Sequence, residues 1–325
     1  MRPFLQAAGV TARRCSLPLQ RAVTDFGADH AFGQVPKKLQ EHYGITIGAS
    51  TVRKLTERHG LRMQGQQTQE SGPIGTQGWP QQIGELDGSM VPIVTPDATA
   101  GDKRKHKTLH WQEARLALVH AHGRVTPQFA ATFGGRGEES GQALRACALA
   151  AGFGTNTQLH GVGDGAPWIA EQFTTTVGAQ ASYLVDFYHV CEYLAAAAPL
   201  CAPDTPPVWL EIQKQRLKNN DVAAVLTQLH PYVEGESVDT DHAPVRACVR
   251  YLSNRLPYLN YKGALEKGLP IGSGEIESAH RYVIQERLKV PGAWWKADNV
   301  EPMLALRVVR ANGDWDQYWE QLAAA

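Results

Sequence analysis

The chain has 325 residues, 43% of them hydrophobic and 20% charged, so it can bury a large core and is not globally disordered. Its 32 basic and 32 acidic side chains give no net charge, and no apolar run reaches about 18 residues, so we expect a cytoplasmic protein that spans no membrane. Five cysteines without a C-x-x-C pair argue against a standard zinc finger and against a disulfide framework.

The zero net charge hides a basic first fifth of the chain. Residues 1–65 carry ten Lys or Arg against four acids, a net charge of +6 that leaves −6 for the remainder. Within this region, Pro36 suits the first turn of a helix that ends at Gly44. The side chains that this helix is expected to turn inward are Val35, Leu39 and Tyr43.

A second helix is predicted over residues 51–59, with Ser50 as its N-cap. Its outward-facing bases, which are candidates for DNA binding, are Arg53, Lys54 and Arg58. A helix, a glycine-containing turn and a basic second helix form the helix-turn-helix pattern, whose second helix enters a major groove. The alternative is a small solvated helical hairpin without a ligand. Residues 66–80 are rich in Gly and Gln, and we expect a linker there.

From residue 82 the pattern changes to strands and helices. Strands are predicted at 83–93, 109–120, 125–133, 157–163 and 182–187, and helices at 138–151, 167–174 and 189–198. A hairpin meander followed by two further β-α units is the ribonuclease-H-like succession, an α/β fold with a mixed five-stranded sheet.

A helical insertion is expected to interrupt this fold where three closely spaced prolines break the chain. Its helices are predicted at 208–229 and 244–256, and two more helices follow at 273–287 and 299–309. The predicted parts are a small all-α helix-turn-helix region (1–65), a linker (66–80), the ribonuclease-H-like domain in two pieces (81–199 and 271–325) and the insertion (200–270).

Two aspartates next to glycine are the most informative residues of the predicted sheet. Asp87 lies in LDGS within the first strand, and Asp164 lies in GVGDGAPW at the tip of the fourth. A single Asp-Gly pair usually marks only a turn. In this succession of elements, however, both residues reach the same edge of the sheet, where two close carboxylates repel unless divalent cations lie between them.

A third carboxylate is expected from the segment PIGSGEIESAH, residues 270–280. Glu275 and Glu277 fall in the first turn of the helix that follows the glycines. They point about 200° apart around the helix, so only one of them can face the sheet. The alternative is that both acids simply favour the positive N-terminus of the helix.

The succession LDG, GDGAPWI, DFYH, GSGEIE and GDWDQYW resembles the ISKra-type insertion-sequence transposases, a branch of the DDE (Asp-Asp-Glu) enzymes, over roughly residues 82–320. The resemblance implies that Asp87, Asp164 and Glu277 are the catalytic and metal-binding residues, and it leaves Glu275 at a variable position. It also implies a bacterial, nucleoid-associated DNA transposase that works as a homo-oligomer on double-stranded DNA, both the element's terminal repeats and the target.

Two Mg²⁺ ions, with Mn²⁺ as a substitute, follow from that resemblance and from the three acids. Such ions activate a water or a DNA 3′-hydroxyl and stabilise the leaving oxygen, so no serine or tyrosine nucleophile is expected. Asp186 and His189 match the family's Asp-x-x-His, which implies support of the metal site or positioning of DNA. Alternatively, Asp186 only caps the following helix.

Further DNA contacts are predicted from bases and tryptophans. The candidates are Arg287 and Trp295 in the last third of the chain, and Lys103, Arg104 and Lys105 in a strand-connecting loop. Paired tryptophans are more often core residues, and a basic loop can simply be solvated. Two competing functions stay open: an inactive transposase-derived DNA-binding protein, and a sugar hydrolase with paired carboxylates in an uncharged aromatic cleft.

Overall fold

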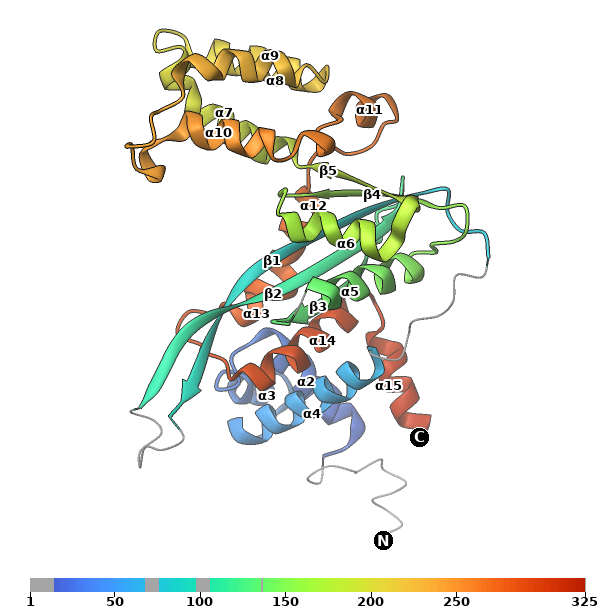
Figure 1. Cartoon of the computed structure of the whole chain (residues 1–325). Coiled ribbons are helices and arrows are strands. Elements are labelled where there is room, and N and C mark those ends of the chain that lie inside the picture. The colour runs from blue at the N-terminus through green and yellow to red at the C-terminus, as the bar shows by residue number, and fades with distance from the viewer. Residues whose placement is uncertain (1–14, 68–75, 98–105, 136, 325) are drawn as a thin grey trace.

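The computed structural model describes residues 15–67, 76–97, 106–135 and 137–324, and its centre is a five-stranded sheet (Figure 1). The strands are β1 (Gln81–Pro96), β2 (Lys107–Ala121), β3 (Gln128–Phe133), β4 (Gln158–Gly163) and β5 (Ala181–Val185). Their order is β3-β2-β1-β4-β5; β1, β2 and β3 pair antiparallel, whereas β4 and β5 run parallel to β1. This is the ribonuclease-H-like arrangement, so the predicted fold class is confirmed.

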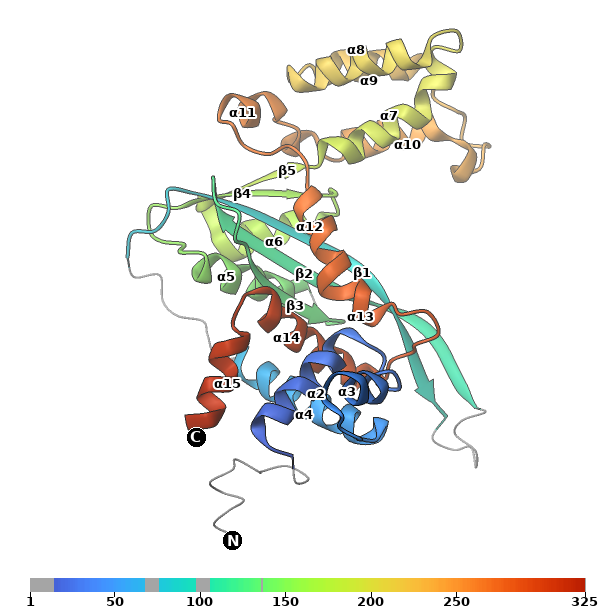
Figure 2. The same cartoon turned by 180° about the vertical axis from the view of Figure 1, so that it is seen from behind.

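Helices cover both faces of the sheet. One face packs on α5 (Gly137–Ala150) and α6 (Pro167–Val177), around a core that includes Leu86 and Phe173. The opposite face carries α12 (Gly274–Ala279), a π-helix (His280–Gln285), α13 (Glu286–Leu288) and α14 (Val300–Ala311), as Figure 2 shows. The helix predicted over 273–287 is present from residue 274 to residue 288, and a π-helical segment lies in its middle.

The insertion packs with α7 (Phe187–Cys201) into a helical body that has its own core beyond β5 (Figure 1). The insertion itself consists of α8 (Pro206–Lys218), α9 (Val222–Leu229), α10 (Pro244–Ser253) and α11 (Tyr261–Glu266). The single helix predicted over 208–229 is wrong, because the chain turns between α8 and α9. Asn220 takes a left-handed conformation there, with φ of 62°, and the carboxylate of Asp221 caps α9 through the Ala224 N–H.

The basic head contains three helices in the described residues: α2 (Leu17–Asp29), α3 (Val35–Tyr43) and α4 (Ala49–Gln67). Helix α3 ends as predicted at Gly44, whose φ of 64° suits a residue without a Cβ. Val35 and Leu39 are buried, but the expectation for Tyr43 is wrong because its side chain is 56% exposed. Helix α4 is longer than predicted and extends to residue 67.

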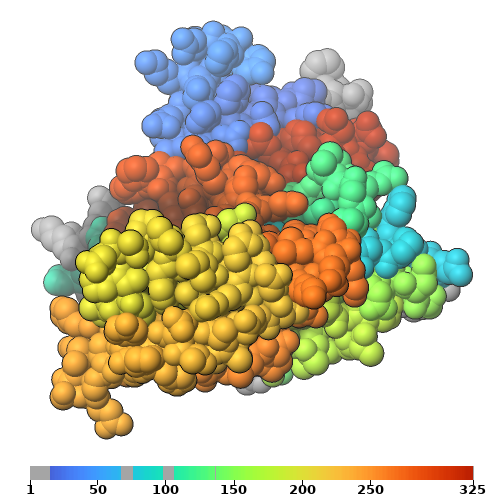
Figure 3. Space-filling model, turned by 90° about the horizontal axis from the view of Figure 1, so that it is seen from above, coloured from blue at the N-terminus to red at the C-terminus, as the bar shows by residue number. Residues whose placement is uncertain are grey.

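The head packs against the C-terminal helices α14 and α15 (Trp315–Ala324). Met63 joins Leu306 and Trp319 in one apolar cluster. The His59 ring contacts the hydroxyl of Tyr318 at 2.7 Å, and burial lowers the pKa of His59 to about 4, so this imidazole is neutral at pH 7. The head and the insertion lie at opposite ends of the sheet (Figure 1). In the view from above, orange and red C-terminal segments lie between the blue head and the yellow insertion (Figure 3). Among the described residues, no helix is both long and apolar enough to cross a membrane.

Candidate active site

Three aspartates lie side by side at neighbouring strands, one within β1 and one directly after each of β4 and β5. Asp87 of β1 and Asp164 each lie two residues beyond the last paired residues of the parallel β1–β4 ladder, Glu85 and Val162. Asp164 and Asp186 likewise each follow the last residue of β4 and β5, which are paired with each other. Because neighbouring strands run about 4.8 Å apart, this register brings the three residues into one row at the carboxyl ends of β4 and β5.

The row faces α12. A Cβ added at Gly161 would lie 2.6 Å from the Phe173 ring of α6, so odd-numbered positions of β4 face that helix. In β1, Leu86 packs in the same core. Since side chains alternate along a strand, Asp87 and Asp164 point to the other face of the sheet, where α12 lies.

Helix α12 is attached to both ends of the row. At one end the backbone N–H and the hydroxyl of Ser273 donate to Oδ2 of Asp186, at 2.6 and 2.5 Å. At the other end Nε2 of His280 lies 3.2 Å from Oδ2 of Asp87. His280 is buried, and neither ring nitrogen makes a hydrogen bond of normal geometry to the described residues. The helix that carries Glu277 is therefore held directly over the aspartates.

A buried acid that the motifs did not identify supports the same helix. Glu85 lies two residues before Asp87 on the same face of β1, and its Oε2 accepts the Ile276 N–H at 2.6 Å. Burial raises the pKa of Glu85 to about 8, with the Ile276 N–H opposing this rise and the Glu275 charge adding to it. An acid inside the apolar run IGELDG was the available sequence signal.

The two acids of α12 point to different partners, as their helical spacing predicts. Oε2 of Glu275 lies 3.2 Å from Nε2 of His120 on β2. This contact lowers the pKa of Glu275 and raises that of His120. Oε1 of Glu277 lies 3.8 Å from Nε2 of His189 on α7, and the Glu277 side chain is 62% exposed. Glu277 is therefore the acid on the side of α7.

Within the described chain, one trio of ligand-type side chains brings its ligand atoms within 4.8 Å of one another: Asp186, His189 and Glu277. Asp87, Asp164 and Glu277 do not form such a trio, and Glu277 lies beside His189. Asp186 is poorly suited to bind a cation, because its oxygens already accept four hydrogen bonds, from the Ser273 N–H and hydroxyl and from the N–H groups of residues 188 and 189. It caps α7, the alternative suggested by the sequence, and it also fixes Ser273.

Asp87 and Asp164 have acceptor capacity left. Oδ1 of Asp87 accepts the Gly88 N–H at 2.7 Å, and Oδ1 of Asp164 accepts the Ala166 N–H at 2.8 Å. A carboxylate offers about four lone-pair sites, so each of these hydrogen bonds fixes the side chain without saturating it. Such oxygens are the ligands that Mg²⁺ prefers in proteins.

The residues predicted to bind DNA have contrasting surroundings. The three bases of α4, Arg53, Lys54 and Arg58, are exposed. Arg287 is buried: its Nε donates to the Gly27 carbonyl at 3.0 Å, its guanidinium lies 4.7 Å from the ring centres of Phe32 and Trp295, and burial lowers its pKa to about 10.

Trp295 is only 6% exposed, and its Nε1–H donates to the Leu288 carbonyl at 3.1 Å. The prediction that Arg287 and Trp295 contact DNA is therefore corrected: both belong to the core between the head and the sheet. Lys103, Arg104 and Lys105 lie outside the described residues.

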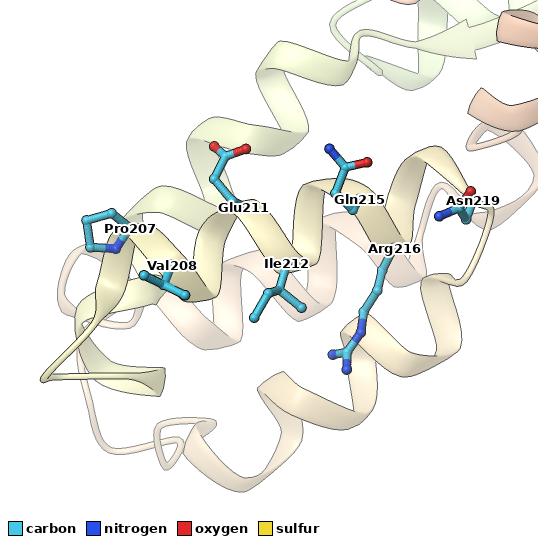
Figure 4. Close-up of a pocket in the computed structure, with 7 residues that line it drawn as sticks. All are labelled: Pro207, Val208, Glu211, Ile212, Gln215, Arg216 and Asn219. Atoms are coloured by element: carbon cyan, nitrogen blue, oxygen red, sulfur yellow. The ribbon is translucent and has the colours of Figure 1, made fainter.

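A groove of about 660 Å³ runs along α8 of the insertion, away from these acids (Figure 4). Val208 and Ile212 are exposed in its lining, and Glu211 is paired with Lys214 at 2.7 Å. In Figure 4, Glu211 points to one side of α8 and Ile212 to the other. The surface of the groove is mostly apolar, so it is a poorer candidate for an active site than the row of acids at the edge of the sheet.

Residues 155–321 match the model of the Uncharacterised protein family (UPF0236), which is just over half of the chain. The chain belongs to this family. The UPF0236 region contains Asp164, Asp186 and Glu277, whereas Asp87 and the head precede it. No curated protein matches the chain.

One solved structure similar to this UPF0236 protein is the Drosophila P element transposase strand transfer complex. The identity is 9% and the TM-score 0.35, over 98% of this chain and 84% of that one. A TM-score of 0.35 is too low to carry an argument, so the strand order, the row of aspartates and the sequence motifs are the basis for assigning a function.

Proposed function

We propose that this UPF0236 protein is a DDE transposase of the ISKra type, which cleaves DNA at the ends of an insertion sequence and joins those ends to target DNA. The observation that supports the proposal is the side-by-side position of Asp87, within β1, and Asp164, directly after the parallel strand β4, under the helix that carries Glu277. The five motifs in order, from LDG to GDWDQYW, support it independently.

The side chains suit two divalent cations held by Asp87, Asp164 and Glu277. Neighbouring carboxylates on one face repel one another, and an intervening cation removes this repulsion. The ring nitrogens of the buried His280, beside Asp87, make no regular hydrogen bond to the described residues. The site therefore contains buried polar atoms whose hydrogen-bonding capacity is not used within the chain as described. When bound, Mg²⁺ or Mn²⁺ supplies an activated water or 3′-hydroxyl and stabilises the leaving oxygen.

The neighbouring residues then have positioning roles. Asp186 holds Ser273 and the first turn of α7, and so fixes the start of α12 relative to the sheet. His189, beside Glu277, holds that carboxylate toward α7 or contacts the DNA backbone. The buried Glu85 accepts the Ile276 N–H and supports the helix from below.

DNA recognition is assigned to the head. The exposed bases of α4 belong to the second helix of the proposed helix-turn-helix, which would read the terminal repeats in a major groove. Two ends must be handled together, so we propose a homo-oligomer assembled on DNA in the bacterial nucleoid.

The test is cleavage and joining of end-labelled element DNA by the full chain. We expect Asp87→Asn and Asp164→Asn each to lower both reactions by at least about 100-fold, the upper range for groups that merely support a metal ligand. DNA affinity should persist, because the substitutions are nearly isosteric. Asp298→Asn, at an exposed position outside the site, is the matched control.

Cutting that continues in the presence of a chelator, or full activity of either Asn variant, would contradict the proposal. Binding without cutting by the wild-type protein, in Mg²⁺ and in Mn²⁺, would support the alternative of an inactive transposase-derived DNA-binding protein.

A further inference from the structure

The helical insertion reaches back onto the loop that carries Asp164. The hydroxyl of Tyr251, on α10, donates to the Asp164 carbonyl at 2.5 Å. Nε of Arg255, just after α10, donates to the Gly165 carbonyl at 2.8 Å. Two successive peptide groups at the proposed metal site therefore depend on donors that lie about 90 residues further along the chain.

The two donors are themselves held in one geometry. The Arg255 guanidinium lies 3.8 Å from the centre of the Tyr251 ring, and its Nη1 donates to the Tyr251 carbonyl at 3.1 Å. On its other side the Tyr251 ring stacks on Tyr193 of α7, with centroids 4.1 Å apart and planes 22° apart. Tyr251 is only 7% exposed. The pair thus forms a packed, hydrogen-bonded unit rather than two mobile surface side chains.

The same loop is also bound by the sheet and by itself. The Gly165 N–H donates to the hydroxyl of Tyr183 on β5 at 3.1 Å, and within the loop the Ala166 N–H donates to the Asp164 carboxylate at 2.8 Å. Gly165 has a φ of +83°, and a Cβ at this position would lie 2.5 Å from Nε of Arg255. The close approach of Arg255 therefore requires glycine here.

We propose that Tyr251 and Arg255 are positioning residues for Asp164, so that the insertion sets the direction of this carboxylate. The inference rests on the proposed function, because it assigns Asp164 as a metal ligand. Loss of the Tyr251 hydrogen bond frees the peptide group bonded to the Asp164 Cα, and loss of the Arg255 hydrogen bond frees the peptide group that follows it. In either case the backbone at residue 164 can turn, and the carboxylate turns with it. A ligand displaced by a fraction of an ångström binds a cation less tightly while the surrounding core stays packed.

The experiment measures Mn²⁺ binding to the full chain by calorimetry, without DNA and independently of catalysis. Tyr251→Phe removes one hydroxyl and keeps the ring and its stacking, and Arg255→Lys keeps the charge but loses the planar guanidinium. We expect each variant to raise the Mn²⁺ dissociation constant about tenfold, as for other groups that orient metal ligands. Arg250→Lys, at an exposed position on the same helix, should leave it unchanged.

The cleavage assay supplies a second readout. Excess Mn²⁺ should restore cutting by Tyr251→Phe toward the wild-type rate, whereas it should not restore Asp164→Asn. Wild-type Mn²⁺ affinity in both positioning variants would overturn the inference and leave the transposase proposal intact. Absence of Mn²⁺ binding by the wild-type protein would overturn the proposed function itself. If Tyr251→Phe does not fold, as judged by its thermal transition, the same criteria apply to Arg255→Lys.

Discussion

Glu275 and Glu277 lie two residues apart on one short helix, yet their surroundings give them different roles. Glu275 is paired with His120 of β2, which lies on the far side of β1 from β4 and β5. Glu277 instead lies beside His189, next to the row of aspartates. Glu275 lies 3.2 Å from its histidine, whereas Glu277 lies 3.8 Å from His189 and next to the row, so Glu277 is the acid more available to a cation there.

We therefore expect Glu277→Gln to abolish DNA cleavage and Glu275→Gln to keep most of it. Glu275 is about half exposed, so loss of its pair with His120 should cost at most about 1 kcal/mol of stability. The measurement is the cleavage rate of both variants at saturating Mg²⁺, with thermal unfolding as the control for folding. An inactive Glu275→Gln protein beside an active Glu277→Gln protein would show that the roles of the two acids are reversed.

The contact of α4 with α14 determines how the head is attached. Gly60 of α4 lies so close to α14 that an added Cβ would be 2.4 Å from the Pro302 carbonyl oxygen and 2.9 Å from the carbonyl carbon. Backbone atoms cannot move aside as a flexible side chain can. The absence of a side chain at residue 60 is therefore a condition for this packing.

Gly60→Ala should lower the free energy of unfolding by about 1–3 kcal/mol, the usual cost of overpacking a tight contact. Gly65→Ala is the matched control on the same helix, because a Cβ there meets nothing within 4 Å. It should be neutral or stabilise the helix by up to about 1 kcal/mol. Urea unfolding followed by circular dichroism compares the two, and equal midpoints would mean that the α4–α14 contact is looser than described.

The strands could be predicted because their alternation of apolar and polar residues is a local sequence pattern. Helix α2 could not be predicted in this way. The buried face of α2 includes the polar residues Gln20 and Thr24, which weaken its apolar periodicity. Asp87 and Asp164 could be singled out as Asp-Gly pairs at strand positions. The contacts that organise the site could not, because they join distant residues: Glu85 to Ile276 spans 191 positions, and Tyr251 to Asp164 spans 87.

On the scale of the whole molecule, the sheet separates two helical bodies of different character. The head lies at one end and carries the excess of basic residues, and the insertion lies at the other and contacts the Asp164 loop. Buried contacts such as Met63 with Leu306 and Trp319 join the head to the C-terminal helices. The head, to which we assign DNA recognition, is therefore firmly joined to the part of the chain that carries the acids.

Replacing Arg53, Lys54 and Arg58 together by Gln should weaken binding of the full chain to element ends. Each lost phosphate contact should make the dependence of log affinity on log salt shallower by about 0.9. Lys262→Gln, on α11 of the insertion, is the control and should leave this slope unchanged. The measurement is fluorescence anisotropy over a salt series. An unchanged slope in the triple variant would remove α4 from the DNA interface.

If Asp87, Asp164 and Glu277 hold the cations of a DNA-cutting site, anomalous diffraction from crystals grown with Mn²⁺ will locate the ions there. We predict two manganese peaks about 4 Å apart at the edge of the sheet, with Asp87 and Asp164 among the ligands and Glu277 bound to one ion. A single peak between His189 and Glu277, or no peak beside Asp87, would show that these three acids do not hold the cations.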